Sequence, residues 1–187
     1  MIRELHSEDL PELALLAART YSETFGYSLT PEELEVEIKE HRSEAYFRSV
    51  IGNDTLLGAI LDDKLVGYVQ FGDVKVEVKG VQPGSDDRAV HALYVHSDAQ
   101  WRGFGRLLMD AAFNHSQIRN ARNIFIDVWE ENRRALNFYL QYGFVEVGTC
   151  DVVVDGNIVG SDLVLMRSVK NEDESTGRRG PDAIADT

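Results

Sequence analysis

Apolar residues in the first fifty positions recur every three or four residues, which is the spacing of amphipathic helices. Between residues 7 and 25 they fall on one face, with Ser7 placed to cap the helix start. That face is formed by Leu10, Leu13, Ala14, Ala17, Tyr21, Thr24 and Phe25. The segment Thr30-Pro31-Glu32-Glu33 has the form of a capping box with proline at the first helical position, and it predicts a second, acidic helix toward His41. A short third helix is expected at residues 43–51.

Shorter apolar runs follow at residues 56–61 and 65–71. Their length is that of strands, and the intervening Asp62-Asp63-Lys64 predicts that they form a hairpin. Beyond them, Val74, Val76 and Val78 alternate with polar residues and either extend the second strand or begin its exit. Residues 79–87 contain two glycines and a proline, so they are expected to form a loop.

The second half of the chain alternates strand and helix patterns. Strands are expected at 89–95, 124–129, 144–147 and 162–169, with helices at 103–118 and 133–142. The first of these helices carries an apolar face made of Phe104, Leu107, Leu108, Ala111, His115 and Ile118. Strands joined through a helix pair in parallel, so the pattern predicts one parallel pair within residues 89–129. The fold class expected for residues 1–170 is a single α/β (α+β) domain with a mixed, mostly antiparallel sheet flanked by helices. Residues 171–187 lack apolar runs and are expected to form a disordered tail.

The composition is that of one globular domain. The chain has 187 residues, 43% of them hydrophobic and 27% charged, and its apolar runs are far shorter than the roughly 20 residues of a membrane span. Its first residues are acidic where a secretory signal is basic and then apolar, so a cytoplasmic location is expected. One cysteine, Cys150, allows neither an intrachain disulfide nor a cysteine zinc site. No metal is expected, because His6, His41, His96 and His115 lack metal-ligand spacing.

Charge is distributed unevenly along the chain. The formal net charge is −13, which disfavours nucleic acid as a partner. Residues 101–134 depart from this background, because they contain six arginines and four acidic residues, a net of +2. An anionic ligand is therefore expected in this segment.

A glycine-containing loop lies at the start of the same segment. Its sequence, between a strand and a helix, is Gln100-Trp101-Arg102-Gly103-Phe104-Gly105-Arg106. Glycines let the backbone approach a ligand, and free N–H groups at a helix N-terminus bind phosphate. Two glycines at a helix start also simply ease a tight turn. Two nucleotide motifs can be set aside, because no Gly-Lys-Ser/Thr is present and Leu108 stands where a dinucleotide fingerprint has its third glycine.

Two motifs taken together resemble the GNAT acetyltransferase superfamily. The first is Gln-x-x-Gly-x-Gly after the strand Ala92-Leu93-Tyr94-Val95. The second, after the next strand, is Asn132-x-x-Ala135-x-x-Phe138-Tyr139-x-x-x-Gly143-Phe144. The resemblance covers residues 1–169. Three further matches, Thr24-Phe25, Val128-Trp129-Glu130-x-Asn132 and Asp162-Leu163-x-Leu165-Met166, resemble the PaiA-like branch, whose members acetylate polyamines.

The resemblance implies where acetyl-coenzyme A (acetyl-CoA) binds. Strands 89–95 and 124–129 are expected to splay apart, so that the pantetheine arm pairs with the backbone of Leu93, Tyr94 and Val95. The pyrophosphate is expected on the loop residues Gln100, Trp101, Arg102, Gly103, Phe104, Gly105 and Arg106. Asn132 matches a position that bonds the pantetheine arm, and Phe138 matches one that packs near it. Arg133 and Arg134 either reach the nucleotide phosphate or form an ordinary solvated helix start.

The resemblance also suggests catalytic roles. Tyr139 matches the general acid that protonates the departing thiolate, and this role is favoured over that of a core tyrosine on an amphipathic helix because both motifs are present. The backbone N–H of Val95 matches the donor to the thioester carbonyl. Many members carry a glutamate as base where this chain has His91, which could relay a proton or be a buried structural histidine. Glu130 is another candidate base or cation anchor, or else a solvated loop acid.

These residues predict a transferase, an acetyl-CoA-dependent N-acetyltransferase that acts in a ternary complex. The expected acceptor is a small cationic amine, best a polyamine. The resemblance to the PaiA-like branch implies it, and the acidic first hundred residues agree with it, because the family's acceptor site is built largely from this side of the fold. Most of the acidic side chains at Glu32, Glu33, Glu35, Glu37, Glu40 and Glu44 are nevertheless expected to lie on an exposed helix face. Alternative functions are acetylation of a protein N-terminus or lysine, and a coenzyme A-binding sensor or interaction module without turnover. The expected partners exclude nucleic acid and membranes, and the chain is expected to be a monomer or a homodimer.

Overall fold

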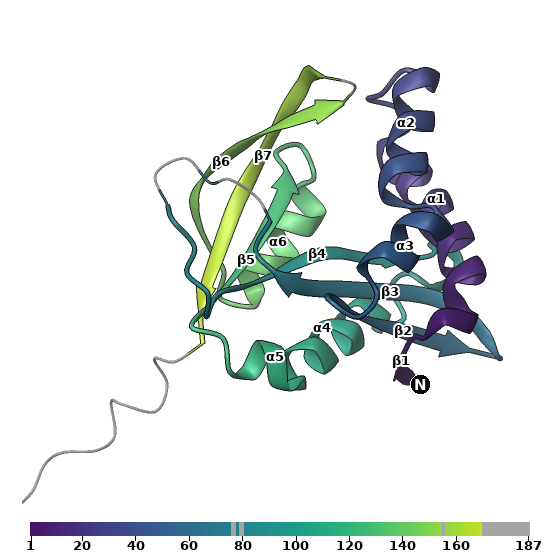
Figure 1. Ribbon diagram of the computed structural model, residues 1–187, viewed down its shortest axis with the longest axis horizontal. Coiled ribbons are helices and arrows are strands. Elements are labelled where there is room, and N and C mark those ends of the chain that lie inside the picture. The colour runs from purple at the N-terminus through teal and green to yellow at the C-terminus, as the bar shows by residue number, and fades with distance from the viewer. Residues whose placement is uncertain (76–77, 79–80, 155, 170–187) are drawn as a thin grey trace, which may run out of the picture.

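A seven-stranded sheet forms the centre of the computed structural model, which describes residues 1–75, 78, 81–154 and 156–169 (Figure 1). The spatial order is β1-β2-β3-β4-β5-β7-β6. The strands are β1 (Ile2–Glu4), β2 (Thr55–Leu61), β3 (Lys64–Asp73), β4 (Arg88–Val95), β5 (Asn123–Trp129), β6 (Val145–Val154) and β7 (Asn157–Ser168). Neighbouring strands are antiparallel except for the parallel pair β4 and β5. The mixed, mostly antiparallel sheet and its parallel pair are therefore confirmed.

The parallel strands β4 and β5 separate soon after they begin. Their register contains two pairs, Arg88 with Ile124 and Ala89 with Phe125, and Figure 1 shows the two strands running apart beyond this point. On its other side, β4 stays paired with β3 as far as His96, whose N–H donates to the carbonyl of Val66. Hydrogen-bonded pairs alternate along an antiparallel ladder, so the backbone groups of Leu93 and Val95 face the opening toward β5. The divergence thus leaves polar backbone unpaired by β5.

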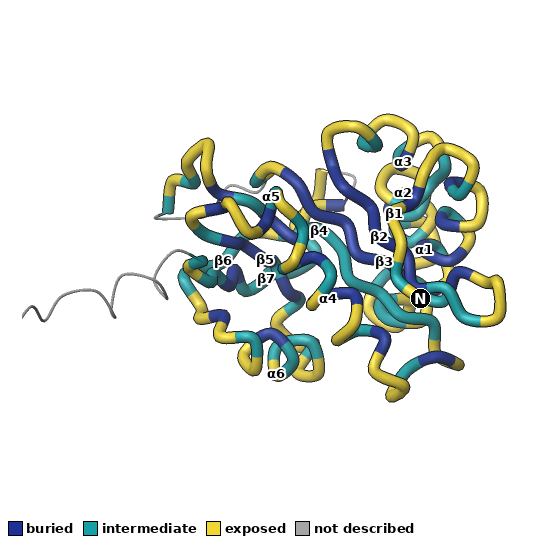
Figure 2. The backbone as a smooth tube through the Cα atoms, turned by 90° about the horizontal axis from the view of Figure 1, so that it is seen from below, coloured by how far each residue is buried: buried dark blue, intermediate teal, exposed yellow. Residues whose placement is uncertain are grey.

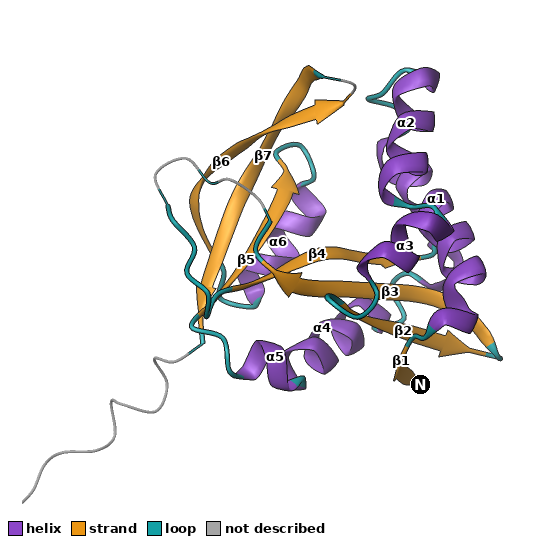
Figure 3. Cartoon of the chain, in the orientation of Figure 1, coloured by secondary structure: helices purple, strands orange, loops and turns teal. Residues whose placement is uncertain are grey.

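Helices cover both faces of the sheet (Figure 3). On one face, α1 (Leu10–Phe25), α2 (Pro31–His41) and α3 (Glu44–Val50) form a layer, and Leu10 and Phe47 of this layer pack with Tyr68 of β3. On the other face lie α4 (Phe104–Asn114), α5 (Ser116–Arg119) and α6 (Arg133–Gln141). There Leu108 and Tyr139 join the core of β3 and β5. Burial along the chain follows these layers (Figure 2). No helix of the described residues is long and apolar enough to cross a membrane.

Local sequence signals account for where several elements begin and turn. The hydroxyl of Thr30 accepts from the Glu33 N–H at 3.2 Å, and the Glu33 carboxylate accepts from the Thr30 N–H at 2.8 Å, which completes the predicted capping box of α2. In the β2–β3 turn, Asp62 and Asp63 have φ values of 49° and 60°. Aspartate tolerates this left-handed region, and two such residues give the tight hairpin turn that matches strand twist.

Three sequence expectations need correction. The helix expected at 103–118 is two helices, because His115 is extended (φ −71°, ψ 142°), and Leu107 is half exposed while Met109 is buried. The last two strands are much longer than 144–147 and 162–169, and they meet near Gly156, whose positive φ of 76° suits a turn. Strand β1 was not expected at all. Val76 and the tail at 171–187 lie outside the described residues.

Candidate active site

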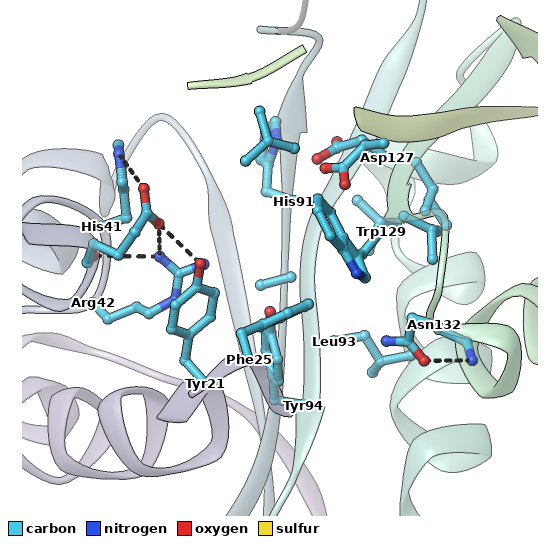
Figure 4. Close-up of a pocket in the computed structure, with 18 of the residues that line it drawn as sticks. Tyr21, Phe25, His41, Arg42, His91, Leu93, Tyr94, Asp127, Trp129 and Asn132 are labelled. Atoms are coloured by element: carbon cyan, nitrogen blue, oxygen red, sulfur yellow. Dashed lines mark hydrogen bonds and ion pairs between the residues drawn. The ribbon is translucent and has the colours of Figure 1, made fainter. Parts of the chain in front are cut away.

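A cavity of about 470 Å³ lies in the opening between β4 and β5. Side chains from α1, α2, β3, β6 and β7 complete its walls. Five of the residues expected to bind the cosubstrate or to act in catalysis line it, namely His91, Leu93, Tyr94, Asn132 and Tyr139. Figure 4 shows Tyr21, His41 and Arg42 on one side of it and Asp127 and Trp129 on the other, with His91 and Tyr94 between them.

One end of this site has the groups that a pantetheine thioester needs. The carbonyl of Val95 accepts from the Gln100 side chain at 3.0 Å, while the Val95 N–H faces the opening with Leu93. Tyr139 lies on α6 at the cavity wall and is 7% exposed. Burial raises the pKa of Tyr139, and Tyr94 and Asp127 raise it further, so the phenol keeps its proton at neutral pH. Asn132 caps α6, because its side-chain oxygen accepts from the Ala135 N–H at 3.1 Å.

The glycine loop lies outside the cavity lining, between the end of β4 and the start of α4. Trp101 and Gly103 have positive φ values of 63° and 85°, which turn the chain so that the first N–H groups of α4 are free of helical partners. Gln100 fixes the loop, because its side chain bonds Val95 and accepts from Arg134 at 2.7 Å. The guanidinium carbon of Arg134 also lies 4.6 Å from the centre of the Trp101 ring.

This loop fits the polyphosphate of acetyl-CoA. Arg102, Arg106, Arg133 and Arg134 are all exposed around the helix start, where cations and free N–H groups together favour an anion. Phe104 is 8% exposed and belongs to the core, so only its backbone is available to a ligand. Phe138 packs between Tyr139 and Tyr142 rather than lining the cavity.

The wall formed by the helices α1 and α2 contains a neutralised ion pair. Arg42 donates to Glu37 at 3.0 Å, and the Tyr21 hydroxyl donates to the same carboxylate oxygen at 3.2 Å. The guanidinium of Arg42 stacks over the Tyr21 ring at 3.5 Å. Glu37 is the buried member of the acidic run, in which Glu32, Glu35 and Glu40 are exposed. The pair presents little net charge to a ligand.

A second neutralised group surrounds His91. Buried Asp54 accepts from the Lys75 ammonium and from the Gln70 amide, both at 2.6 Å, and lies 3.9 Å from Nε2 of His91. A register shift in β4 at this point gives His91 its position. Burial and the nearby Lys75 charge lower the pKa of His91 to about 4, so the imidazole is neutral at pH 7.

The opposite wall presents two carboxylates with no such neutralisation. Asp127 of β5 and Asp162 of β7 both line the cavity, and burial raises the pKa of each, that of Asp162 to about 7. The charges of Asp127 and Glu130 contribute to the shift at Asp162. Among the described residues, no cation shifts the pKa of either group. These carboxylates are therefore the strongest sites for a positive charge in the cavity.

Trp129 forms the wall beside them. Its ring stands directly over Gly160 of β7, and its buried indole nitrogen has no hydrogen-bond partner among the described residues. Glu130, singled out from the sequence, is exposed and does not line the cavity. No group of three or more described His, Cys, Asp or Glu side chains is arranged to hold a metal.

The sequence interpretation missed the roles of Asp127, Trp129, Asp162 and Arg42. Asp127 interrupts the apolar run Ile124-Phe125-Ile126 with a charge that would be costly in an ordinary buried strand. That interruption was a usable signal. Nothing local marks Arg42, because only the packing of α2 against the sheet brings it to the cavity.

Comparisons with known proteins agree with this geometry. The acetyltransferase (GNAT) family matches residues 15–144. An uncharacterised N-acetyltransferase of the pepI 3′ region of Lactobacillus delbrueckii subsp. lactis is 24% identical over 179 residues, which is 90% of this chain and 96% of that protein.

Solved structures share the fold at low identity. The PaiA N-acetyltransferase of Thermoplasma acidophilum, solved with coenzyme A, is 21% identical with a TM-score of 0.72 over 90% of this chain and 98% of that one. A ribosomal-protein-alanine N-acetyltransferase of Brucella melitensis is 22% identical with a TM-score of 0.64 over 90% and 99%. The chain belongs to the GNAT family and is an acetyl-CoA-dependent N-acetyltransferase.

Proposed function

We propose that the acceptor is a primary amine on a small cationic molecule, with the polyamines spermidine and spermine as the first candidates. The observation that carries this proposal is the contrast between the two walls of the cavity. On one wall, Glu37 is paired with Arg42, and the lining residue Lys75 is paired with Asp54, which lies behind the lining. On the other wall, Asp127 and Asp162 face the cavity without a described cation beside them. A buried carboxylate without a counter-ion is stabilised by a ligand that brings one.

The size of the cavity supports a small acceptor. Its volume of about 470 Å³ is in the range of small-molecule sites and must also hold the acetyl end of the cosubstrate. The PaiA-like residues Thr24, Phe25, Trp129 and Asp162 support a polyamine in particular, and three of them line the cavity, namely Phe25, Trp129 and Asp162. A cytoplasmic location, expected from the sequence, is part of the same proposal.

In the proposed reaction the amine attacks the thioester directly. The Val95 N–H is placed to donate to the carbonyl oxygen as negative charge develops there. Tyr139, held protonated by burial, gives its proton to the departing thiolate. The Glu37–Arg42 pair and Tyr21 hold the wall against which the acceptor lies.

A release assay for free coenzyme A tests the proposal. Acetyl-CoA is offered with spermidine, spermine, n-butylamine, an aminoglycoside, and peptides with a free N-terminus or an internal lysine, and products are identified by mass spectrometry. We expect turnover with spermidine and spermine to exceed turnover with the singly charged n-butylamine. Activity confined to peptides would refute the small-amine proposal in favour of protein acetylation. Acetyl-CoA binding without any acetylated product would favour a non-catalytic sensor.

The variant Asp127→Asn tests the wall directly, because it removes one cavity charge while keeping the side chain's shape. The variant should raise the KM for spermidine more than the KM for acetyl-CoA. Equal effects on both, or none, would contradict the assignment of this wall to the acceptor.

A further inference from the structure

We infer that Asp162 is the proton acceptor for the amine, with Asp127 as the second carboxylate of a working pair. This inference rests on the proposed function and deepens it, because it assigns the step that the sequence left between His91 and Glu130. It identifies a catalytic residue on β7, a strand that neither of the two main family motifs includes.

The register of the sheet brings the two carboxylates together. Strands β5 and β7 are antiparallel, with Asp162 opposite Trp129 and Asp127 opposite Val164. Residues two apart on a strand point to the same face, so Asp127 and Asp162 are diagonal neighbours across the ladder. Both line the cavity that Tyr139 also lines, from the other side of the β4–β5 opening. The pair therefore faces the space between the general acid and the acceptor wall.

Two carboxylates at such a position share protons. The negative charge of one disfavours ionisation of the other, so the pair takes up a proton at a higher pH than an isolated aspartate does. The charged groups that raise the pKa of Asp162 are Asp127 of β5, Glu130 of the turn after it and Glu37 of α2. Asp162 in turn raises the pKa of the Tyr94 hydroxyl of β4. Cys150, the register partner of Asp162, and Asp151 add titratable groups from β6. All of the acids in this set oppose a second negative charge.

The two candidates from the sequence are less suited to the step. His91 is neutral at pH 7 with a pKa of about 4, so its protonated form is too acidic to hold a proton taken from an ammonium group. Its Nε2 is buried and has no hydrogen-bond partner among the described residues. Glu130 is exposed and lies outside the cavity lining. Asp162 combines access to the cavity with a pKa matched to neutral pH.

The step balances as follows. The acceptor enters as an ammonium ion, and one of its protons passes to the Asp162 carboxylate, which leaves a lone pair on nitrogen. That lone pair forms the C–N bond to the thioester carbonyl carbon, and the C–S bond breaks with its electron pair on sulfur. The Tyr139 hydroxyl protonates the sulfur, and the resulting phenolate takes the second proton lost from nitrogen, which restores the hydroxyl. Asp162 then releases its proton to solvent.

The kinetic test uses Asp162→Asn, which keeps the shape but cannot accept a proton, with Asp162→Glu as the conservative variant. For wild type with spermidine, kcat/KM should rise with pH through a midpoint near 7. Asp162→Asn should lower kcat/KM at pH 7 by about a hundredfold to ten-thousandfold and should abolish the rise of kcat/KM around pH 7. The difference in kcat/KM between wild type and variant should become smaller by pH 10, because more of the acceptor amine is then already neutral. Asp162→Glu should restore part of the rate. Asp63→Asn, in the exposed β2–β3 turn, removes one charge away from the cavity and should leave the profile unchanged.

Two kinetic results would overturn the inference. One is a pH profile of kcat/KM in Asp162→Asn that equals that of wild type. The other is a rise of kcat/KM around pH 7 that is lost in His91→Gln but kept in Asp162→Asn.

A second measurement separates this inference from the proposed function. Carboxyl ¹³C NMR of the aspartate-labelled full chain should show one aspartate that titrates near pH 7 and is missing in Asp162→Asn. Addition of spermidine should lower its midpoint, because a bound ammonium favours the carboxylate. If the Asp162 carboxyl signal titrates below pH 5, or if its midpoint does not change on addition of spermidine, the role of Asp162 is overturned even if amines are acetylated. If spermidine shifts the midpoint but no amine is acetylated, the proposed transfer fails while the carboxylate pair stands.

Discussion

Replacement of Gly160 by alanine should displace the Trp129 ring and so disturb the acceptor wall. An ideal Cβ at position 160 would lie 1.9 Å from Cη2 and 2.1 Å from Cζ3 of Trp129. Ordinary contact begins at 3.4 Å, so the ring must move by about 1.5 Å. Overpacking of this kind costs about 1–3 kcal/mol of stability. A shift of about 1 Å in a substrate-positioning group can reduce the rate by about a hundredfold, and we expect a loss of that order in kcat/KM.

The assay combines turnover with the fluorescence of Trp129. The chain has two tryptophans, and a Trp101→Phe background leaves Trp129 as the sole tryptophan. In that background, Gly160→Ala should shift the emission to longer wavelength as the ring leaves its buried position. Gly84→Ala is the matched control, because a Cβ there meets its nearest atom, a carboxylate oxygen of Asp87, at 3.9 Å. Unchanged emission together with unchanged turnover in Gly160→Ala would refute the role of this contact in shaping the cavity.

Three further predictions concern catalysis and stability. Tyr139→Phe should lower kcat by about a hundredfold or more with an unchanged Kd for acetyl-CoA measured by calorimetry, and an unchanged kcat would remove the general-acid role. Folding raises the pKa of Asp162 from 3.8 to about 7, so its contribution to stability is present below pH 4 and lost as the pH rises through 7. Asp162→Asn should therefore be more stable than wild type at pH 8 by about 1–4 kcal/mol in urea unfolding, with little difference at pH 4; a destabilised variant at pH 8 would contradict the raised pKa. Phe47→Ala removes a side chain with no exposed surface from the core beneath α1 and should cost about 3–5 kcal/mol, measured the same way, and a cost under about 1 kcal/mol would show that this packing is loose.

Most of the fold could be predicted because its elements carry local signals. The capping box at Thr30, the Asp62-Asp63 turn and the helical spacing of residues 7–25 each depend on contacts within a few residues. The β6–β7 hairpin has no comparable signal. Strand β6 is at the edge of the sheet, and Val145 and Val153 are more than half exposed, so its apolar pattern does not follow a buried face. Such a strand is defined by pairing with β7, which short windows of sequence do not reveal.

The coenzyme half and the acceptor half of the site also differed in how far they could be predicted from the sequence. The coenzyme half is built from a loop and two helix starts whose residues are close in sequence, and its motifs were recognised. The acceptor half brings together residues that are far apart in the sequence. They are Glu37 of α2, Arg42 directly after α2, Asp127 of β5 and Asp162 of β7. Only the tertiary packing places these residues around one space. The acidic first hundred residues suggested a cationic acceptor, yet the two unneutralised carboxylates of the cavity come from the second part of the chain.

One structural feature explains both halves. Where β5 leaves β4, the sheet loses the hydrogen bonds that would have paired Leu93 and Val95, and it opens a partly buried space lined by Asp127 and Asp162. The N–H groups of these two residues, which β5 leaves unpaired, suit the amide and thioester oxygens of the cosubstrate. The partly buried carboxylates are unfavourable as charges, which raises their affinity for a proton or an ammonium ion. Restoring the ladder between β4 and β5 would strengthen the sheet and remove both properties together, so the stability lost at the divergence and the activity of the site have the same origin.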